Sequence, residues 1–174
     1  MRQKIRTAEA ALAAVRADGM SLLDVPEEMK TAEVCMAAVR EYGPALAFVP
    51  TAMKTEEVCL EAVKQDGRAL RWVPAGMKTE EVCIEAVRQS GRALKFVPER
   101  LKTPAVCLEA VRRRGLSLLD VPVGLRTETI CTEAVRQNPS TMQFVPGRHR
   151  DAVRATLVED ADASTEPETD GPRP

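Results

Sequence analysis

TEEVCIEAVRQSGRALKFVPERLK, residues 79–102, is one copy of the 24-residue unit that decides the fold of this chain. Copies follow one another without insertion or deletion through residue 150, and they begin at Thr7, Thr31, Thr55, Thr79, Thr103 and Thr127. A fixed period of about 20–50 residues is typical of stacked-repeat proteins, in which each unit packs only on its neighbours. The sequence therefore predicts a solenoid without a single central core.

The first half of the unit has the features of a capped α-helix. Threonine at position 1 is a favourable N-cap, and the glutamates at positions 2 and 3 suit the positive end of a helix dipole. Glycine at position 13 is the residue expected at a left-handed C-cap. We therefore expect a helix over about positions 2–12. Its apolar positions 4, 5, 6, 8 and 9 span a wide arc, which predicts contact with neighbours on two sides.

A second, shorter helical segment is expected over positions 14–18, because proline at position 20 disfavours helix at the residue before it. The predicted fold class is all-α, an α-solenoid of six 24-residue two-helix repeats. The alternative is an α/β solenoid like the leucine-rich repeats, which the Val-Pro-x-x-Leu string superficially suggests. We disfavour it because the cysteine ladder lies mid-helix and no asparagine ladder is present.

Four segments are expected along the chain. Residues 1–6 form a lead-in and residues 7–150 the six-repeat solenoid. Residues 151–158 are expected to form a capping helix, with Asp151 as N-cap. Residues 159–174 are acidic, rich in Pro, Thr and Asp, and are expected to be a disordered tail.

Charge and hydropathy narrow the class of protein. Residues 1–150 carry 23 Lys and Arg against 19 Asp and Glu, whereas residues 151–174 carry 2 against 7. Neither balance is extreme enough to require a nucleic acid or a membrane as partner. No apolar run reaches the roughly 20 residues of a membrane span, and Glu9 and Arg16 interrupt the stretch that would serve as a Sec signal. We expect a cytoplasmic protein with no membrane association.

The residues that usually carry catalysis or bind metals are scarce or badly spaced. The five cysteines recur every 24 residues, too far apart for a zinc site or for disulfides between stacked helices. We interpret them as small buried hydrophobes whose thiols favour a reducing compartment. His149 is the one histidine, and no phosphate-binding loop or metalloprotease motif occurs. The chain is expected to be no enzyme, with no catalytic residue, metal or cofactor.

The candidate partner-binding site lies on the second segment of the unit. Aromatic residues recur at position 18, and basic residues accompany them at positions 14 and 17. Aromatic and arginine side chains are the usual anchors of protein interfaces. An intramolecular cation–π contact at i,i+4 spacing, Arg68 with Trp72 and Arg92 with Phe96, is the alternative explanation. The candidate residues are Phe48, Arg68, Arg71, Trp72, Arg92, Lys95, Phe96 and Phe144.

A second candidate is a basic ladder at position 10, which would bind phosphate or nucleic acid. In units three to six a glutamate at position 7 is placed to pair with the basic residue at position 10, so the alternative interpretation is a solvated face without a binding role. Nucleic-acid binding is therefore the less favoured of the two interpretations. The anion-binding candidates are Arg40, Lys64, Arg88, Arg112 and Arg136.

The unit resembles the bacterial repeat family called domain of unknown function 4116. The resemblance rests on residues 59–63, Gly67, residues 69–70 and residues 73–74, with their counterparts in the other copies, and it covers residues 7–150. It implies tandem helical repeats and carries no activity or site residues. From the solenoid surface we expect a non-enzymatic protein–protein interaction scaffold. Neither the protein partner nor an oligomeric state is specified by the sequence.

Overall fold

Each unit folds into one α-helix and one six-residue 3₁₀-helix, as the computed structural model of residues 5–163 shows. Units one to five add a three-residue 3₁₀-turn before the next unit. The α-helices are α1 (Ala8–Ala17), α2 (Ala32–Glu41), α3 (Glu56–Gln65), α4 (Glu80–Gln89), α5 (Pro104–Arg113), α6 (Glu128–Gln137) and α7 (Gly147–Ala163). The six-residue 3₁₀-helices are η1 (Gly19–Asp24), η3 (Gly43–Phe48), η5 (Gly67–Trp72), η7 (Gly91–Phe96), η9 (Gly115–Asp120) and η11 (Pro139–Phe144). The turns are η2 (Glu27–Met29), η4 (Thr51–Met53), η6 (Ala75–Met77), η8 (Glu99–Leu101) and η10 (Val123–Leu125).

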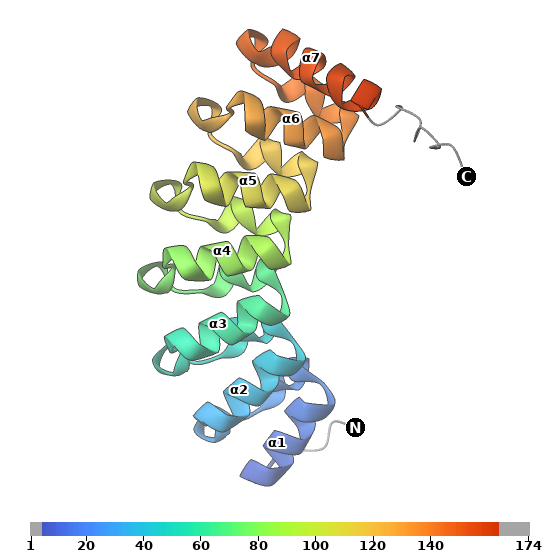
Figure 1. The fold of residues 1–174 in the computed structure, drawn as a ribbon. Coiled ribbons are helices and arrows are strands. Elements are labelled where there is room, and N and C mark those ends of the chain that lie inside the picture. Colours follow the sequence, from blue (N-terminus) through green and yellow to red (C-terminus); the bar gives the residue numbers. More distant parts are fainter. Residues whose placement is uncertain (1–4, 164–174) are drawn as a thin grey trace, which may run out of the picture.

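The α-helices lie side by side in chain order and form one layer of a bowed stack, and the C-terminal ends of the α-helices lie on the inner edge of the bow (Figure 1). The six-residue 3₁₀-helices form the second layer, and each contacts the α-helix of its own unit and that of the next. Residues 5–163 contain no β-strand. The predicted all-α solenoid is confirmed, and the alternative of an α/β solenoid is wrong.

The core is a continuous seam between the two layers. In unit three the buried residues Val58, Cys59, Ala62 and Val63 come from α3, and Ala69, Leu70 and Val73 from η5 and its end. Their equivalents are buried in the neighbouring units. The predicted inward positions 4, 5, 8 and 9 are thus confirmed, whereas position 6 is only half-buried, as at Leu60. Small side chains at positions 5 and 8 allow helices on both sides to approach closely.

The N-terminal caps form as predicted. In every unit the threonine Oγ1 accepts a hydrogen bond from the backbone N–H three residues later, at 3.1–3.4 Å. At the other end the helix stops at position 11, and position 12 is extended. In units one, three and six, an Asp or Asn at position 12 then caps the 3₁₀-helix through its own side chain.

The predicted left-handed C-cap at position 13 is wrong. No glycine among residues 5–163 has a positive φ. Glycine is needed for space instead: a Cβ on Gly67 would lie 2.1 Å from the carbonyl oxygen of Ala86 in the next unit. The equivalent carbonyl oxygen at position 8 of unit three, that of Ala62, would lie 2.4 Å from a Cβ on Gly43. Position 13 is therefore the point of closest backbone approach between consecutive units.

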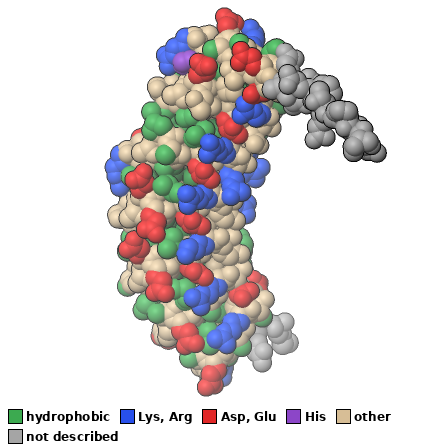
Figure 2. Space-filling model, viewed as in Figure 1, with side chains coloured by type: hydrophobic (Ala, Val, Ile, Leu, Met, Phe, Trp, Pro, Cys, Tyr) green, Lys and Arg blue, Asp and Glu red, His purple; other side chains and the backbone are tan. Residues whose placement is uncertain are grey.

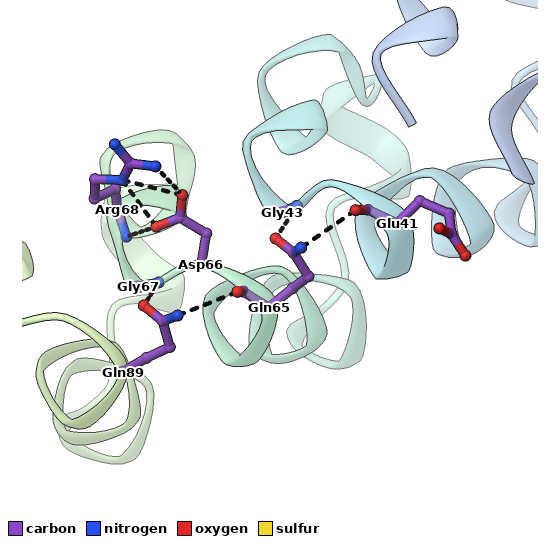
Figure 3. A network of polar contacts seen from close by, with 7 residues as sticks. All are labelled: Glu41, Gly43, Gln65, Asp66, Gly67, Arg68 and Gln89. Atoms are coloured by element: carbon purple, nitrogen blue, oxygen red, sulfur yellow. Dashed lines mark hydrogen bonds and ion pairs between the residues drawn. The ribbon is translucent and has the colours of Figure 1, made fainter. Parts of the chain in front are cut away.

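Two polar contacts join consecutive units where backbone groups would otherwise lack partners. Gln65 Oε1 accepts a hydrogen bond from the Gly43 N–H at 2.6 Å, while its Nε2 donates to the Glu41 carbonyl at 3.2 Å. Gln89 repeats both bonds one unit later, to Gly67 and Gln65 (Figure 3). Each glutamine amide thus connects its helix to the preceding helix end and 3₁₀-helix start.

The basic residue at position 24 makes the second contact. Its side chain donates to the backbone carbonyl at position 18 of the next unit, as in Lys78 Nζ to Phe96 O at 3.0 Å. The same bond recurs from Lys30, Lys54, Lys102 and Arg126. Burial lowers the pKa of Lys78. These bases therefore join each unit to the next.

The C-terminal end departs from the expected capping helix of residues 151–158. Helix α7 begins at Gly147, and the chain passes through Asp151 without a break, because this residue does not take the extended cap conformation of the threonines. Instead the Asp151 carboxylate accepts from Arg154 at 3.4 Å. The helix also continues to Ala163, so residues 159–163 are helical where a disordered tail is expected. The remaining tail, residues 164–174, and residues 1–4 of the lead-in lie outside the described residues.

Candidate functional site

A groove crosses the middle of the inner edge, where the α-helices of units two to five end and the 3₁₀-helices begin. It consists of two adjoining hollows of about 770 and 540 Å³ that share Tyr42, Arg68, Arg92 and Arg114. We call it the central groove. Lysine and arginine side chains gather at this edge of the central units (Figure 2). The other lining residues are Pro44, Gln65, Asp66, Arg71, Trp72, Gln89, Ser90, Gly91, Lys95, Phe96, Arg113 and Asp120.

The central groove is strongly basic. Six Lys and Arg side chains line it, against the two carboxylates of Asp66 and Asp120. Asp66 is committed to Arg68, whose Nη2 lies 2.7 Å from its Oδ2 and whose backbone N–H lies 2.8 Å from its Oδ1 (Figure 3). Burial raises the pKa of Asp66, but the hydrogen bonds and charge of Arg68 outweigh it and hold the pKa below its usual value. This carboxylate therefore stays ionised and neutralises one of the six cations.

The remaining cations lack carboxylate partners within residues 5–163. Arg92 and Arg113 are exposed and Arg114 is half-buried, and none of the three forms an ion pair with a described carboxylate. Their guanidinium groups are open to an incoming anionic group. Arginine suits such recognition because its planar fork presents two parallel donors to a carboxylate or phosphate.

The aromatic residues of the groove carry cations on their faces. Arg71 lies over the Trp72 ring at 4.9 Å and Lys95 over the Phe96 ring at 4.8 Å. The expected i,i+4 pairs, Arg68 with Trp72 and Arg92 with Phe96, do not form. The reason is that η5 and η7 are 3₁₀-helices, with about three residues per turn, so i,i+4 residues do not share a face. Trp72 remains 39% exposed.

Six of the eight residues predicted for partner binding line this one hollow: Arg68, Arg71, Trp72, Arg92, Lys95 and Phe96. Phe48 and Phe144 line neither hollow of the groove; both are half-buried and pack against the core. Phe96 is half-buried and packed against the core as well, so Trp72 is the exposed member of the predicted aromatic row, and Trp72 and Phe96 are the two members that line the groove.

Sequence reasoning missed Tyr42, Arg113 and Arg114. They occupy positions 11 and 12, which bring them to the inner edge beside the 3₁₀-helix of the preceding unit. A signal was available, because position 12 carries a capping Asp or Asn in three units but Tyr42 in unit two and Arg114 in unit five. A large residue at a capping position indicates a role other than capping.

The alternative anion-binding residues lie on the exposed face of the α-helices, away from the groove. Arg40 Nε lies 3.2 Å from Glu61 Oε1 of the next unit, and Arg136 pairs with Glu133 at 3.2 Å and with Asp160 of α7. Lys64, Arg88 and Arg112 are exposed on the same row. Basic and acidic side chains alternate along the visible face of the stack (Figure 2). This row carries mixed charge, unlike the groove.

The five cysteines lie inside the seam. All are buried and free of disulfides, and burial raises the pKa of each thiol, that of Cys107 to about 11. Within residues 5–163, no group of His, Cys, Asp and Glu side chains is arranged to hold a metal ion. None of the described helices is long and apolar enough to cross a membrane.

Comparison with known proteins adds a family and nothing more. The model for "Domain of unknown function (DUF4116)" matches three overlapping windows, residues 31–78, 55–102 and 79–126, each two units long. No curated protein and no solved structure matches the chain. The windows together span more than half of the sequence and advance by one unit each. The chain therefore belongs to the family described as Domain of unknown function (DUF4116).

Proposed function

We propose that this protein is a non-enzymatic interaction scaffold that binds a protein partner in the central groove. The observation that carries the proposal is the convergence on one hollow of the exposed Trp72, the half-buried Phe96 and arginines without carboxylate partners. Such residues, clustered in a concave surface, are typical binding hot spots.

The distribution of variation among the units supports the same site. Positions 1, 5, 8, 9, 16 and 20 are filled by residues whose structural role is visible in caps, seam and turn. Positions 11, 12, 14, 17 and 18 differ from unit to unit, and together with Gly91 at position 13 they provide all the lining residues of the groove. The chain thus keeps constant scaffold positions and varies the inner edge and positions 21 and 22 of the 3₁₀-turns. Buried thiols suit a reducing compartment, so we propose the cytoplasm as the location.

The test is quantitative affinity capture with Trp72→Ala/Phe96→Ala against wild type. The matched control is Leu23→Ala/Val123→Ala, which removes two exposed apolar side chains, 54% and 62% exposed, from 3₁₀-helices outside the groove. We expect recovery of a specific protein to fall at least about ten-fold for the groove variant only. Circular dichroism and the urea midpoint establish that both variants are folded. Equal capture by all three proteins would reject the groove as the binding site.

Phosphate or nucleic-acid binding by Arg40, Lys64, Arg88, Arg112 and Arg136 is the weaker proposal. Glu61 of the next unit pairs with Arg40, and Glu133 and Asp160 pair with Arg136, which reduces the attraction of a polyanion to this row. A steep loss of RNA binding with added salt, abolished by Lys64→Ala/Arg88→Ala/Arg112→Ala, would favour this alternative. We expect no such binding at 50 mM salt.

A further inference from the structure

The shape of the central groove restricts the conformation of what it binds. It is lined by residues of four consecutive units, from Tyr42 of unit two to Arg114 of unit five, so it runs along the stack. Equivalent side chains recur in units three and four, Arg68 and Arg92 at position 14 and Trp72 and Phe96 at position 18. In unit five the lining arginines, Arg113 and Arg114, come from positions 11 and 12. Packed helices lie about 8–10 Å apart, which sets the spacing of these repeated contacts.

A polyproline II helix matches this spacing. It has three residues per turn and rises about 3.1 Å per residue, so side chains on one face recur about every 9 Å. An extended β-strand presents same-face side chains about every 7 Å and falls out of step within two units. An α-helix is about 10–12 Å wide with its side chains, and its turns recur every 5.4 Å. Aromatic-lined grooves are also the usual docking sites of polyproline II segments.

The charge of the groove favours acidic side chains in the segment that it binds. Arg92, Arg113 and Arg114 have no described carboxylate partner, and they follow Arg68 along the same edge. We propose that the groove binds an acidic segment of about nine residues in the polyproline II conformation, with a carboxylate at every third position and apolar residues between them against Trp72 and Phe96. This inference rests on the proposed function and names the class of its partner.

A nucleic acid fits the same groove less well. Arg71 and Lys95 each cover a face of the aromatic rings on which bases would stack. Asp120 adds negative charge to the lining, which a continuous phosphate backbone would meet. A peptide can place an apolar or polar residue opposite this carboxylate.

Fluorescence polarisation with labelled, end-blocked peptides tests the proposal on the full-length protein. The period-three probe is PPEPPEPPE, and the permuted probe PEPPPEEPP has the same composition with no two glutamates separated by a multiple of three residues. We expect the period-three probe to bind at least about ten-fold more tightly at 50 mM salt, and Arg92→Ala to weaken it about five-fold or more. Arg100→Ala is the matched control, because Arg100 is equally exposed in η8 but lies outside the groove lining. It should leave the affinity within two-fold of wild type.

Three results would overturn the proposal. Equal affinity for both probes would show that the groove responds to net charge and not to spacing. An Arg92-dependent preference for a 12-nucleotide poly-uridine RNA would assign the groove to nucleic acid. Absence of binding by either probe, with capture still dependent on Trp72 and Phe96, would leave the proposed function standing and reject this partner class.

Discussion

At the scale of single residues, Gly67 and Gly76 show two different uses of the same amino acid. A Cβ on Gly67 would lie 2.1 Å from the Ala86 carbonyl oxygen, and this atom belongs to the backbone of the next helix. A Cβ on Gly76, in η6, would have no atom within 4 Å. Neither glycine has a positive φ, so the two are distinguished by their packing and not by their backbone conformation.

We therefore predict that Gly67→Ala lowers the free energy of unfolding by about 1–3 kcal/mol, because units three and four must move apart. Gly76→Ala serves as the control and should leave the protein unchanged or up to about 1 kcal/mol more stable. Urea unfolding followed by circular dichroism measures both. A Gly67→Ala protein as stable as wild type would contradict the close approach.

Residue roles were predictable where one local rule decides them. Threonine caps and the buried positions 4, 5, 8 and 9 of the α-helices follow from the sequence alone. The role of the glycine at position 13 did not follow from the sequence. Glycine is expected both where a left-handed cap is needed and where the next unit approaches closely, so the residue type does not distinguish the two roles. Likewise, the hydrogen bond from Lys78 to the Phe96 carbonyl joins two different units, so the sequence of a single unit does not predict it.

At the scale of the elements, the cysteine of each α-helix lies in the seam with its neighbours. Cys107 of α5 is fully buried, and burial raises its pKa to about 11 from a usual value of about 9. A group whose pKa is higher in the folded state stabilises that state below the unfolded pKa. The contribution is then lost as pH rises through the folded value.

Accordingly, we predict that the free energy of unfolding falls between about pH 9 and 11 as the unfolded chain ionises its thiols. Lys78 has a lowered pKa and acts in the opposite direction, so a comparison with Cys107→Ala isolates the thiol. The variant should show a shallower loss of stability over this range. Parallel curves for the two proteins would contradict the assignment.

The elements of the candidate site were predictable only in part. Positions 14, 17 and 18 were identified because aromatic residues recur at position 18 and basic residues accompany them at positions 14 and 17. The i,i+4 pairs failed because the sequence does not distinguish a six-residue 3₁₀-helix from a turn of α-helix, and the ring partners depend on that difference. Tyr42 and Arg114 reach the site across units, so the sign of them lies in the comparison of position 12 between copies and not within one copy.

At the scale of the whole molecule, stability is expected to be local along the stack, because each unit contacts only its neighbours. The last neighbour of unit six is α7, which buries Val153 completely and leaves Val158 60% exposed. The two valines provide a buried and an exposed site on one helix.

Val153→Asp should therefore detach α7 and loosen α6 without affecting the far end of the stack. A buried carboxylate without a partner is costly, and undocking the terminal helix is the cheapest way to hydrate it. Hydrogen exchange should accelerate at least about ten-fold in α6 and α7 and stay unchanged in α2. Val158→Asp is the control and should leave all three helices protected. Uniform acceleration along the chain would show that the stack unfolds as one cooperative body.

The joint between units has a polarity that bears on how many units there are. One side contributes the position 24 cation, and the other contributes the position 18 carbonyl and the glutamine amide, so the two sides are complementary and different. Such a head-to-tail contact leaves an unpaired side at each end of an open stack, so it sets no limit on the number of copies unless the rotation between units closes a ring. Helix α7 replaces the next copy with a longer helix of another pattern. Because α7 packs on α6, it covers the side of unit six on which the first unit of another molecule could otherwise stack.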